Sequence, residues 1–231
     1  MIRRVLLFDI DGTLIRCGGA GGKSLLAAMA DEFALENVSP VPIHGRTDLG
    51  IVNQLLDDHG IECTEANRHR LYSRYYTLLP ERLSHLAQAA EAHILPGVQS
   101  LLGHLSTSSN FVVGLLTGNM PTSARIKLEH FELWHYFQFG VFGDQADHRP
   151  RLAEPAMAAI SEHCGEQVEA KDVVIIGDTP LDVELAKVMG SRSLAICTGG
   201  FSADELQQSG ADLVLEDLAD NQRVLSWLSS S

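Results

Sequence analysis

Short apolar runs alternate with amphipathic stretches along most of the chain. Amphipathic helical patterns occupy residues 121–131, 151–164, 180–190 and 202–210, between apolar runs at 5–8, 111–117, 139–143, 172–177, 193–197 and 211–215. Continuous apolar strands that alternate with helices indicate a parallel sheet with both faces covered. We therefore predict an α/β fold with a Rossmann-like parallel sheet at its core.

Residues 17–92 interrupt this alternation. They contain helical patterns and turn signals but no comparable apolar strand. A single crossover helix needs far fewer residues, so the interval predicts an inserted α-helical subdomain. We place the subdomain at 17–92 and the α/β core at 1–16 and 93–231. The glycine run 18–22 and the segment LPGV at 95–98 are the expected hinges.

The stretch CGGAGGKSLLAAMA (17–30) has a second interpretation. Gly-Lys-Ser at 22–24 matches the end of a nucleotide-binding P-loop, but the first glycine of that motif falls on Cys17. The preceding strand ends in Asp9 and Asp11, whose carboxylates repel a triphosphate without a metal. A flexible glycine hinge that leads into a helix is the better interpretation.

Composition restricts the classes of partner and the compartment. The 231 residues carry 17 basic and 30 acidic side chains, a formal net charge of −13, which argues against nucleic acid or an anionic membrane as the main partner. A small anionic substrate stays compatible, because a metal ion can reverse the local potential. The four cysteines are scattered, and the first apolar run is too short for a signal peptide. No stretch is long enough for a membrane helix, so we expect a cytoplasmic chain.

Polar groups follow four of the predicted strands at the edge where ligands bind in open parallel sheets. The first strand leads into DIDGT (9–13), the second into TGN (117–119), and the fourth into GDTPLD (177–182). The loop after the third strand carries Arg149 and Arg151. Together these groups suit a metal-assisted reaction on an anion.

Asp9 and Asp178 each follow an apolar strand directly. An unpaired carboxylate is costly there, and carboxylates gathered at one sheet edge repel one another unless a cation lies between them. Hard oxygen ligands favour Mg²⁺. The alternative for Asp9 is an ordinary turn residue before a glycine. The placement of both aspartates favours the magnesium site.

The groups at the strand ends resemble the four motifs of the haloacid dehalogenase superfamily, and the helical insertion resembles its first type of cap. The match consists of Asp-x-Asp-Gly-Thr at 9–13, Thr117, a basic residue, and Gly-Asp-x-x-x-Asp at 177–182. The segments GGAGG, GRTD, LPGV, LTGN and GDTPLDVELAKVMG resemble the phosphoglycolate-phosphatase-like branch. The resemblance covers nearly the whole chain and is specific for the superfamily, but much less so for a substrate.

The resemblance implies a role for each matched residue in phosphoryl transfer. Asp9 would attack phosphorus and form an aspartyl-phosphate. Asp11 would protonate the leaving oxygen and then activate the water that hydrolyses the intermediate. The Thr117 hydroxyl and the backbone N–H groups of Gly118 and Asn119 would hold the phosphate oxygens.

The same resemblance implies the ligands of the metal. Asp9, the carbonyl of Asp11 and Asp178 would bind Mg²⁺, which neutralises charge between nucleophile and phosphate. Asp182 would support the metal-bound waters or the basic residue.

The third motif departs from the family pattern of Lys followed by Pro. The chain reads DHRPRLAEPA, in which Arg149 before Pro150 fits the register best and Arg151 is the alternative. An arginine can brace a phosphate and an aspartate with its planar fork, so we expect activity to survive this change. An ordinary surface arginine is the competing interpretation.

The segment HGRTD (44–48) forms a small basic spot in an acidic chain. His44 and Arg46 could meet an anionic substrate, and the resemblance places this loop over the site, so we list Arg46 as a substrate-binding residue. Thr47 alternatively begins a helix as its N-cap. Both interpretations can hold together.

These features predict a magnesium-dependent phosphatase acting on a small organic phosphate monoester, phosphoglycolate-like or a sugar phosphate. The partner is then a small phosphorylated metabolite, and the oligomeric state is open. The first alternative is a sugar phosphomutase, which shares the aspartyl-phosphate. A 2-haloacid dehalogenase has no use for Asp11 or Asp178, and a non-catalytic binding module would gain nothing from costly clustered carboxylates.

Overall fold

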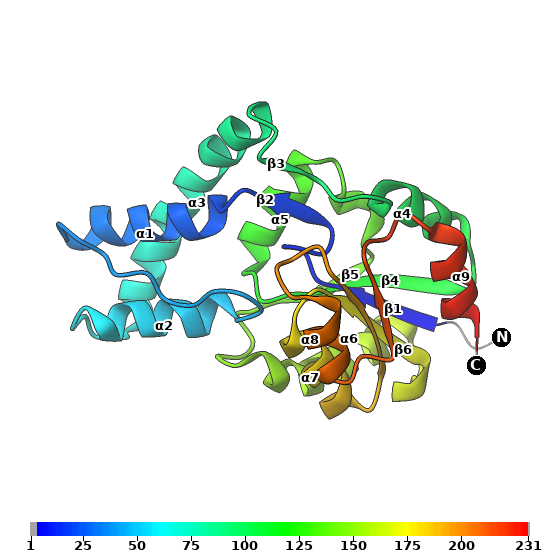
Figure 1. The fold of residues 1–231 in the computed structure, drawn as a ribbon. Helices are drawn as coiled ribbons and strands as arrows, with labels where there is room; N and C mark the ends of the chain where they lie inside the picture. Colours follow the sequence, from blue (N-terminus) through cyan, green and yellow to red (C-terminus); the bar gives the residue numbers. More distant parts are fainter. Residues whose placement is uncertain (1–3, 231) are drawn as a thin grey trace.

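A six-stranded parallel sheet forms the centre of the protein, in a computed structural model that describes residues 4–230. The strand order is β5-β4-β1-β6-β7-β8, with every pair parallel (Figure 1). The strands are β1 (Arg4–Phe8), β4 (Phe111–Leu116), β5 (Phe139–Val141), β6 (Val173–Gly177), β7 (Arg192–Ile196) and β8 (Leu213–Leu215). They coincide with the six predicted runs to within about two residues, which confirms the α/β class.

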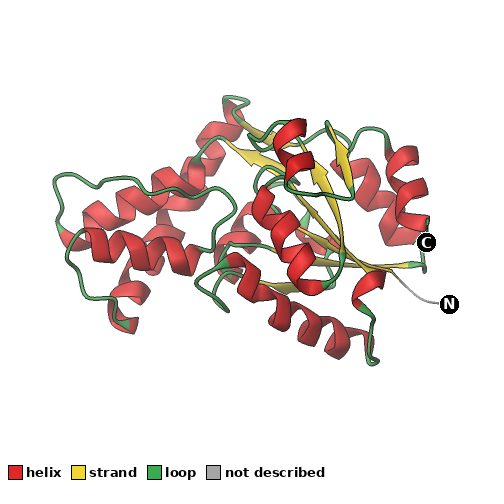
Figure 2. Ribbon diagram, turned by 60° about the horizontal axis from the view of Figure 1, so that its bottom comes forward, coloured by secondary structure: helices red, strands yellow, loops and turns green. Residues whose placement is uncertain are grey.

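Helices cover both faces of the sheet (Figure 2). In β1, Leu6 and Phe8 belong to the buried cluster of one face, and Val5 and Leu7 to that of the other, as the two-residue period of a strand requires. The first face packs against α4 (Val98–Thr107), α5 (Pro121–His130) and α9 (Asn221–Ser229). The second packs against α6 (Ala153–Cys164) and α7 (Pro180–Met189), and the short α8 (Ala203–Gln208) packs on β7.

Three helices form the insertion predicted between the first two core strands. They are α1 (Ala20–Phe33), α2 (Asp48–Asp58) and α3 (Glu65–Gln88). Figure 1 shows them beyond the carboxyl ends of the core strands. The apolar residues of α1 and α3 join the same buried cluster as the first sheet face, so the helical insertion and core share one apolar interior. Thr47 caps α2 as predicted, its hydroxyl accepting a hydrogen bond from the Gly50 N–H at 3.3 Å.

An antiparallel pair of short strands joins the insertion to the core. β2 (Ile15–Cys17) pairs with β3 (Ala92–Ile94), with Cys17 opposite Ala92. The boundaries predicted between insertion and core, at residues 17 and 92, fall on this pair of strands. The division into two domains stays a prediction. Neither strand was predicted from the sequence.

The glycine run 18–22 is predicted to be a flexible hinge that leads into a helix, and the helix begins inside the run; the flexibility stays a prediction. Residues 20–22 form the first turn of α1, and Gly18 and Gly19 take left-handed backbone angles before it. A helix tolerates glycine at some cost, and tertiary packing on α3 compensates for it here.

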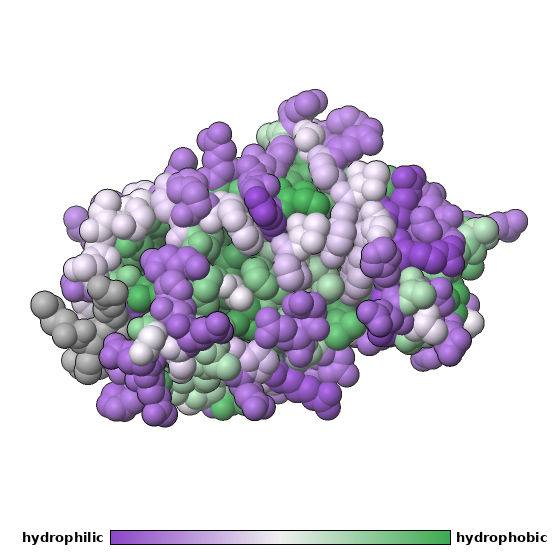
Figure 3. All heavy atoms as spheres, turned by 180° about the vertical axis from the view of Figure 1, so that it is seen from behind, coloured by the Kyte–Doolittle hydropathy of each residue, from purple (hydrophilic) through white to green (hydrophobic). Residues whose placement is uncertain are grey.

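Polar residues dominate the surface. Figure 3 shows them spread over core and insertion on one face, with apolar residues visible mainly between them. Within residues 4–230, no helix has the length and apolar character needed to cross a bilayer.

Gly97 and Gly103 provide a test of backbone packing at α4. Gly97 precedes the helix with φ 78°, and a Cβ there would collide with the backbone of Leu218, whereas a Cβ on Gly103 would meet no atom within 4 Å. We expect Gly97→Ala to lower the free energy of unfolding by about 2–4 kcal/mol, from left-handed strain plus overpacking. Gly103→Ala should raise it by about 0.5–1 kcal/mol. Urea unfolding followed by circular dichroism measures both, and equal effects would contradict the packing of α4 on this loop.

Candidate active site

The end of β1 places Asp9 in the middle of the sheet edge. Its N–H donates to the carbonyl of Ile176 in β6 at 2.9 Å, so Asp9 stands between two neighbouring strand ends. The chain then turns through Gly12, whose φ is 82°. A Cβ on Gly12 would lie 2.5 Å from a carboxylate oxygen of Asp178, and Thr13 donates its hydroxyl hydrogen to the other oxygen at 3.0 Å. Glycine lets this turn approach Asp178 closely.

Asp9, Asp178 and Asp182 form a buried acidic triad. Each offers one carboxylate oxygen, and these oxygens all lie within 4.8 Å of one another. Burial, with repulsion from Asp182, raises the pKa of Asp9 to about 6 despite the attraction of Arg149. Burial and the same repulsion hold the pKa of Asp178 well above its usual value. Crowded, desolvated carboxylates of this kind accommodate a hard cation, so the donor set fits Mg²⁺.

Asp182 is also held by protein groups. One of its oxygens accepts hydrogen bonds from the Thr179 N–H at 3.0 Å and hydroxyl at 2.7 Å, which closes a capping box at the start of α7. The other oxygen accepts a hydrogen bond from Arg149. Asp182 therefore contacts the basic residue, and both roles expected for Asp182 stay predictions.

Arg149, and not Arg151, lies in the site. It comes from the 3₁₀-helix η2 (Arg149–Leu152), is 2% exposed, and its guanidinium nitrogen lies 3.2 Å from the Asp9 carboxylate as well as against Asp182. Burial alone would lower the pKa of Arg149, but the charges of Asp182 and Asp9 raise it. Arg151 is exposed and pairs with Asp147 at 2.9 Å.

The end of β4 supplies the second predicted group. The buried Thr117 hydroxyl accepts hydrogen bonds from the Asn119 side-chain amide at 2.9 Å and from its N–H at 3.3 Å. A Cβ on Gly118 would collide with the carbonyl of Arg46, so glycine lets the helical insertion contact this loop backbone to backbone. The Gly118 carbonyl accepts a hydrogen bond from the Asp48 N–H at 2.7 Å.

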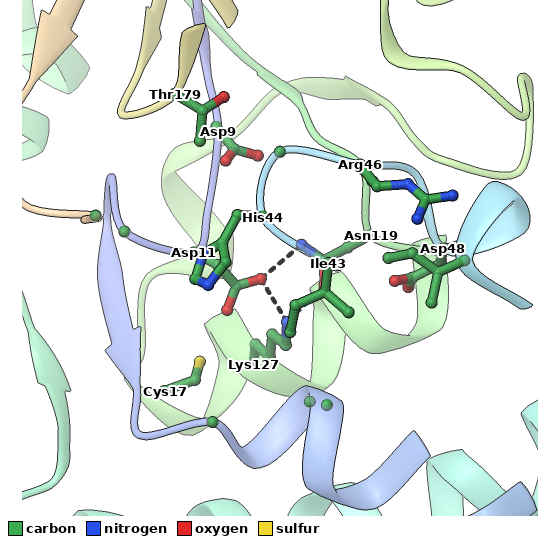
Figure 4. A pocket seen from close by; sticks show the side chains of 18 of the residues that line it. Asp9, Asp11, Cys17, Ile43, His44, Arg46, Asp48, Asn119, Lys127 and Thr179 are labelled. Atoms are coloured by element: carbon green, nitrogen blue, oxygen red, sulfur yellow. Dashed lines mark hydrogen bonds and ion pairs between the residues drawn. The ribbon is translucent and has the colours of Figure 1, made fainter. Parts of the chain in front are cut away.

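Lys127 is a member of the site that the sequence interpretation missed. Its ammonium lies 2.5 Å from Asp11 Oδ2 and 2.6 Å from Asn119 Oδ1, and the Asn119 amide donates to the same Asp11 oxygen at 2.9 Å (Figure 4). Burial would raise the pKa of Asp11, but the charge and hydrogen bond of Lys127 outweigh it and lower that pKa. The sequence did contain a signal for this residue. Lys127 lies on the apolar face of the helix predicted at 121–131, three residues after Ala124 and one before Leu128.

The helical insertion is hydrogen-bonded to the core at this edge. Asp48 accepts hydrogen bonds from the Met120 N–H at 2.8 Å and the Ser123 hydroxyl at 3.1 Å, at the start of α5. The Gly45 carbonyl accepts a hydrogen bond from Arg149 at 3.4 Å. Between core and insertion lies a cavity of about 370 Å³, with Asp9, Asp11, Lys127 and Arg149 on the core side and Leu25 and Ile43 on the insertion side.

Arg46 lines this cavity, but its guanidinium forms hydrogen bonds within the helical insertion. It donates to the Pro42 carbonyl at 2.9 Å and to the Gln54 side chain at 2.8 Å. Figure 4 shows the guanidinium pointing away from Asp9 and Asp11. Substrate contact by Arg46 therefore stays a prediction.

The haloacid dehalogenase-like hydrolase family matches residues 6–196, and its match spans the helical insertion and the four strand ends described above. The chain belongs to this family of hydrolases. Within it, the chain is similar to phosphoglycolate phosphatases. The enzyme of that name from Rhodospirillum rubrum is 27% identical over 94% of this chain and 88% of its own, and that from Chromobacterium violaceum 25% over 94% of each.

Solved structures share the fold. A crystal structure described as a predicted phosphoglycolate phosphatase from Haemophilus somnus superposes with a TM-score of 0.71 at 19% identity, covering 96% of this chain and 98% of that one. A hydrolase from Pseudomonas syringae gives 0.69 at 22% identity, covering 99% and 100%. The insertion is thus part of the shared architecture.

The crowded carboxylates lead to a prediction about stability. The pKa of Asp9 lies near 6 in the folded protein and at its ordinary 3.8 when unfolded. The folded state therefore binds the proton more tightly, and ionisation costs stability as pH rises between these values. Without magnesium at about pH 8, Asp9→Asn should be more stable than the wild type by about 1–3 kcal/mol, and the difference should shrink as the pH falls and vanish below the unfolded pKa of 3.8.

Thermal unfolding across this pH range measures the effect, with the exposed Asp57→Asn as the control. Excess Mg²⁺ should remove the difference by stabilising the wild type alone. A pH-independent gap would show that Asn acts through packing rather than through charge.

Proposed function

We propose that the protein is a magnesium-dependent phosphatase that hydrolyses a small organic phosphate monoester through an aspartyl-phosphate. The observation that carries this proposal is Asp9, buried at a strand end between a cationic brace, Arg149, and the carboxylate of Asp178. A carboxylate so placed can attack phosphorus while neighbouring groups neutralise the charge that develops. The phosphoglycolate phosphatases among the relatives support a phosphoglycolate-like substrate, and a sugar phosphate is the other candidate.

Asp11 serves as acid and base in this proposal. Its pKa lies below the ordinary value, so it enters as the carboxylate. A phosphate monoanion supplies the proton, which Asp11 passes to the oxygen of the leaving alcohol as the P–O bond breaks. Asp11 then removes a proton from the water that attacks the aspartyl-phosphate, which releases phosphate and regenerates Asp9.

The remaining groups bind and orient the phosphate. We expect the hydroxyl of Thr117 and the N–H of Gly118 to bind phosphate oxygens, and the N–H of Asn119 to do so in exchange for its hydrogen bond to Thr117. Arg149 braces both Asp9 and the phosphate. Asp9, the Asp11 carbonyl and Asp178 would hold Mg²⁺, which supplies charge neutralisation when bound.

The predicted alternatives differ in their products. A sugar phosphomutase returns the phosphoryl group to the bound sugar and would yield an isomeric sugar phosphate. A 2-haloacid dehalogenase would release halide without magnesium. The acidic triad, whose carboxylates suit a metal ion, and the polar surroundings of Asp11 favour phosphoryl transfer over attack on carbon.

The first test is phosphate release from p-nitrophenyl phosphate and a panel of small phosphate monoesters, with Mg²⁺ and with a chelator. We expect magnesium-dependent release that Asp9→Asn lowers by roughly 1,000-fold or more, because the nucleophile is lost. Free alcohol with inorganic phosphate supports the phosphatase. Isomerised sugar phosphate would favour the mutase, and no turnover of any compound would refute the proposed chemistry.

The two arginines provide a matched pair of variants. Arg149→Ala should lower kcat/KM by about 100-fold or more, since it removes the buried cation beside the nucleophile. Arg151→Ala, two residues away and exposed, should leave kcat/KM near the wild-type value. Steady-state kinetics with magnesium measure kcat/KM for both variants. A larger loss of kcat/KM in Arg151→Ala would assign the role to Arg151 instead.

A further inference from the structure

Lys127 is a second buried cation in the site, distinct from Arg149. It comes from α5, lines the same cavity, and is 4% exposed. Arg149 contacts Asp9, whereas Lys127 contacts Asp11. Each of the two aspartates of the first motif therefore has a cation of its own.

Lys127, Asn119 and Asp11 form a closed ring of hydrogen bonds. Lys127 donates to Asp11 Oδ2 and to Asn119 Oδ1, and Asn119 donates to the same Asp11 oxygen. Two strong donors from different elements thus fix Oδ2, and the Cys17 thiol, a weak donor, also hydrogen-bonds the carboxylate. A carboxylate held in this way has one orientation instead of the several that an exposed aspartate samples.

The ammonium itself is fixed by the elements around it. A Cβ on Gly21 would lie 3.4 Å from Lys127 Nζ and 3.5 Å from the Tyr75 hydroxyl, so α1 and α3 close directly on the ammonium. Asp48 binds the first turn of α5, the helix that carries Lys127. A buried lysine costs desolvation energy, and this one lies in the cavity wall rather than in a surface ion pair.

We propose that Lys127 is a positioning residue of the reaction, which holds one oxygen of Asp11 so that the other is oriented toward the leaving-group oxygen. This role rests on the proposed phosphatase function. Proton transfer requires the carboxylate within hydrogen-bond reach of that oxygen, and misplacement by about an ångström is enough to lose most of the benefit. Lys127 therefore acts through Asp11 and not on the phosphate.

The test uses leaving groups that differ in their need for a proton. An alkyl phosphate such as glycerol phosphate requires protonation of its leaving oxygen, whereas p-nitrophenolate leaves with little help. Lys127→Met removes the ammonium at similar length, Lys127→Arg keeps a cation, and the exposed Lys171→Met is the control. Circular dichroism and thermal unfolding establish that each variant is folded.

We expect Lys127→Met to lower kcat/KM by about 100-fold for the alkyl phosphate and by less than about 10-fold for p-nitrophenyl phosphate. Asp11→Asn should show the same selective loss, and the double variant should be no worse than Asp11→Asn alone. Lys127→Arg should recover part of the activity on the alkyl phosphate, and Lys171→Met should match the wild type.

Provided that the wild type hydrolyses both substrates, equal losses of kcat/KM on the two substrates would overturn the role of Lys127. Losses that add in the double variant would overturn it as well. The proposed phosphatase function fails separately, if the wild type releases no phosphate from either compound with Mg²⁺. A crystal structure of Lys127→Met provides a readout independent of turnover. It should show the Asp11 side chain rotated or in several conformers, and an unchanged Asp11 would count against the proposal.

Discussion

The buried guanidinium of Arg149 is the interaction on which the site depends. The parallel sheet brings the ends of β1 and β6 together, and with them the carboxylates of Asp9, Asp178 and Asp182. Without a cation, this crowding would favour protonated or displaced side chains. Arg149 contacts two of the three carboxylates, so it favours the ionised form of Asp9 and holds the Asp9 side chain in place. One guanidinium nitrogen, Nη2, contacts both carboxylates, and the other, Nη1, donates to the Gly45 carbonyl of the helical insertion.

The core and most of the site could be predicted because both follow local rules. Each core strand is a continuous apolar run, since both faces are buried, and strand ends of a parallel sheet share one edge. Asp9 and Asp178 could be placed together for that reason, and the structure does so. The choice of Arg149 over Arg151 was open, because two arginines in one loop differ only in which side of a 3₁₀ turn they occupy. Their roles in catalysis remain predictions.

Other parts of the site depend on contacts between distant residues, which a single sequence does not encode in any local pattern. β2 and β3 have three residues each, and Arg16 and His93 at their centres are exposed, so neither is an apolar run. Lys127 resembles an ordinary helix residue until α5 is placed beside Asp11, which lies 116 residues away in the chain. The position of the Arg46 guanidinium likewise depends on a tertiary contact, since it donates to the Gln54 side chain at 2.8 Å.

The contact of Asp48 with α5 has a consequence for substrate exchange. The carboxylate satisfies backbone and side-chain donors at the first turn of a core helix, and its own N–H is bound to the Gly118 carbonyl. Moving the helical insertion away from the core would leave that helix start without its acceptor until water replaces it. A displacement of the helical insertion would therefore be coupled to loosening of the first turn of α5, the same helix that carries Lys127 near its other end.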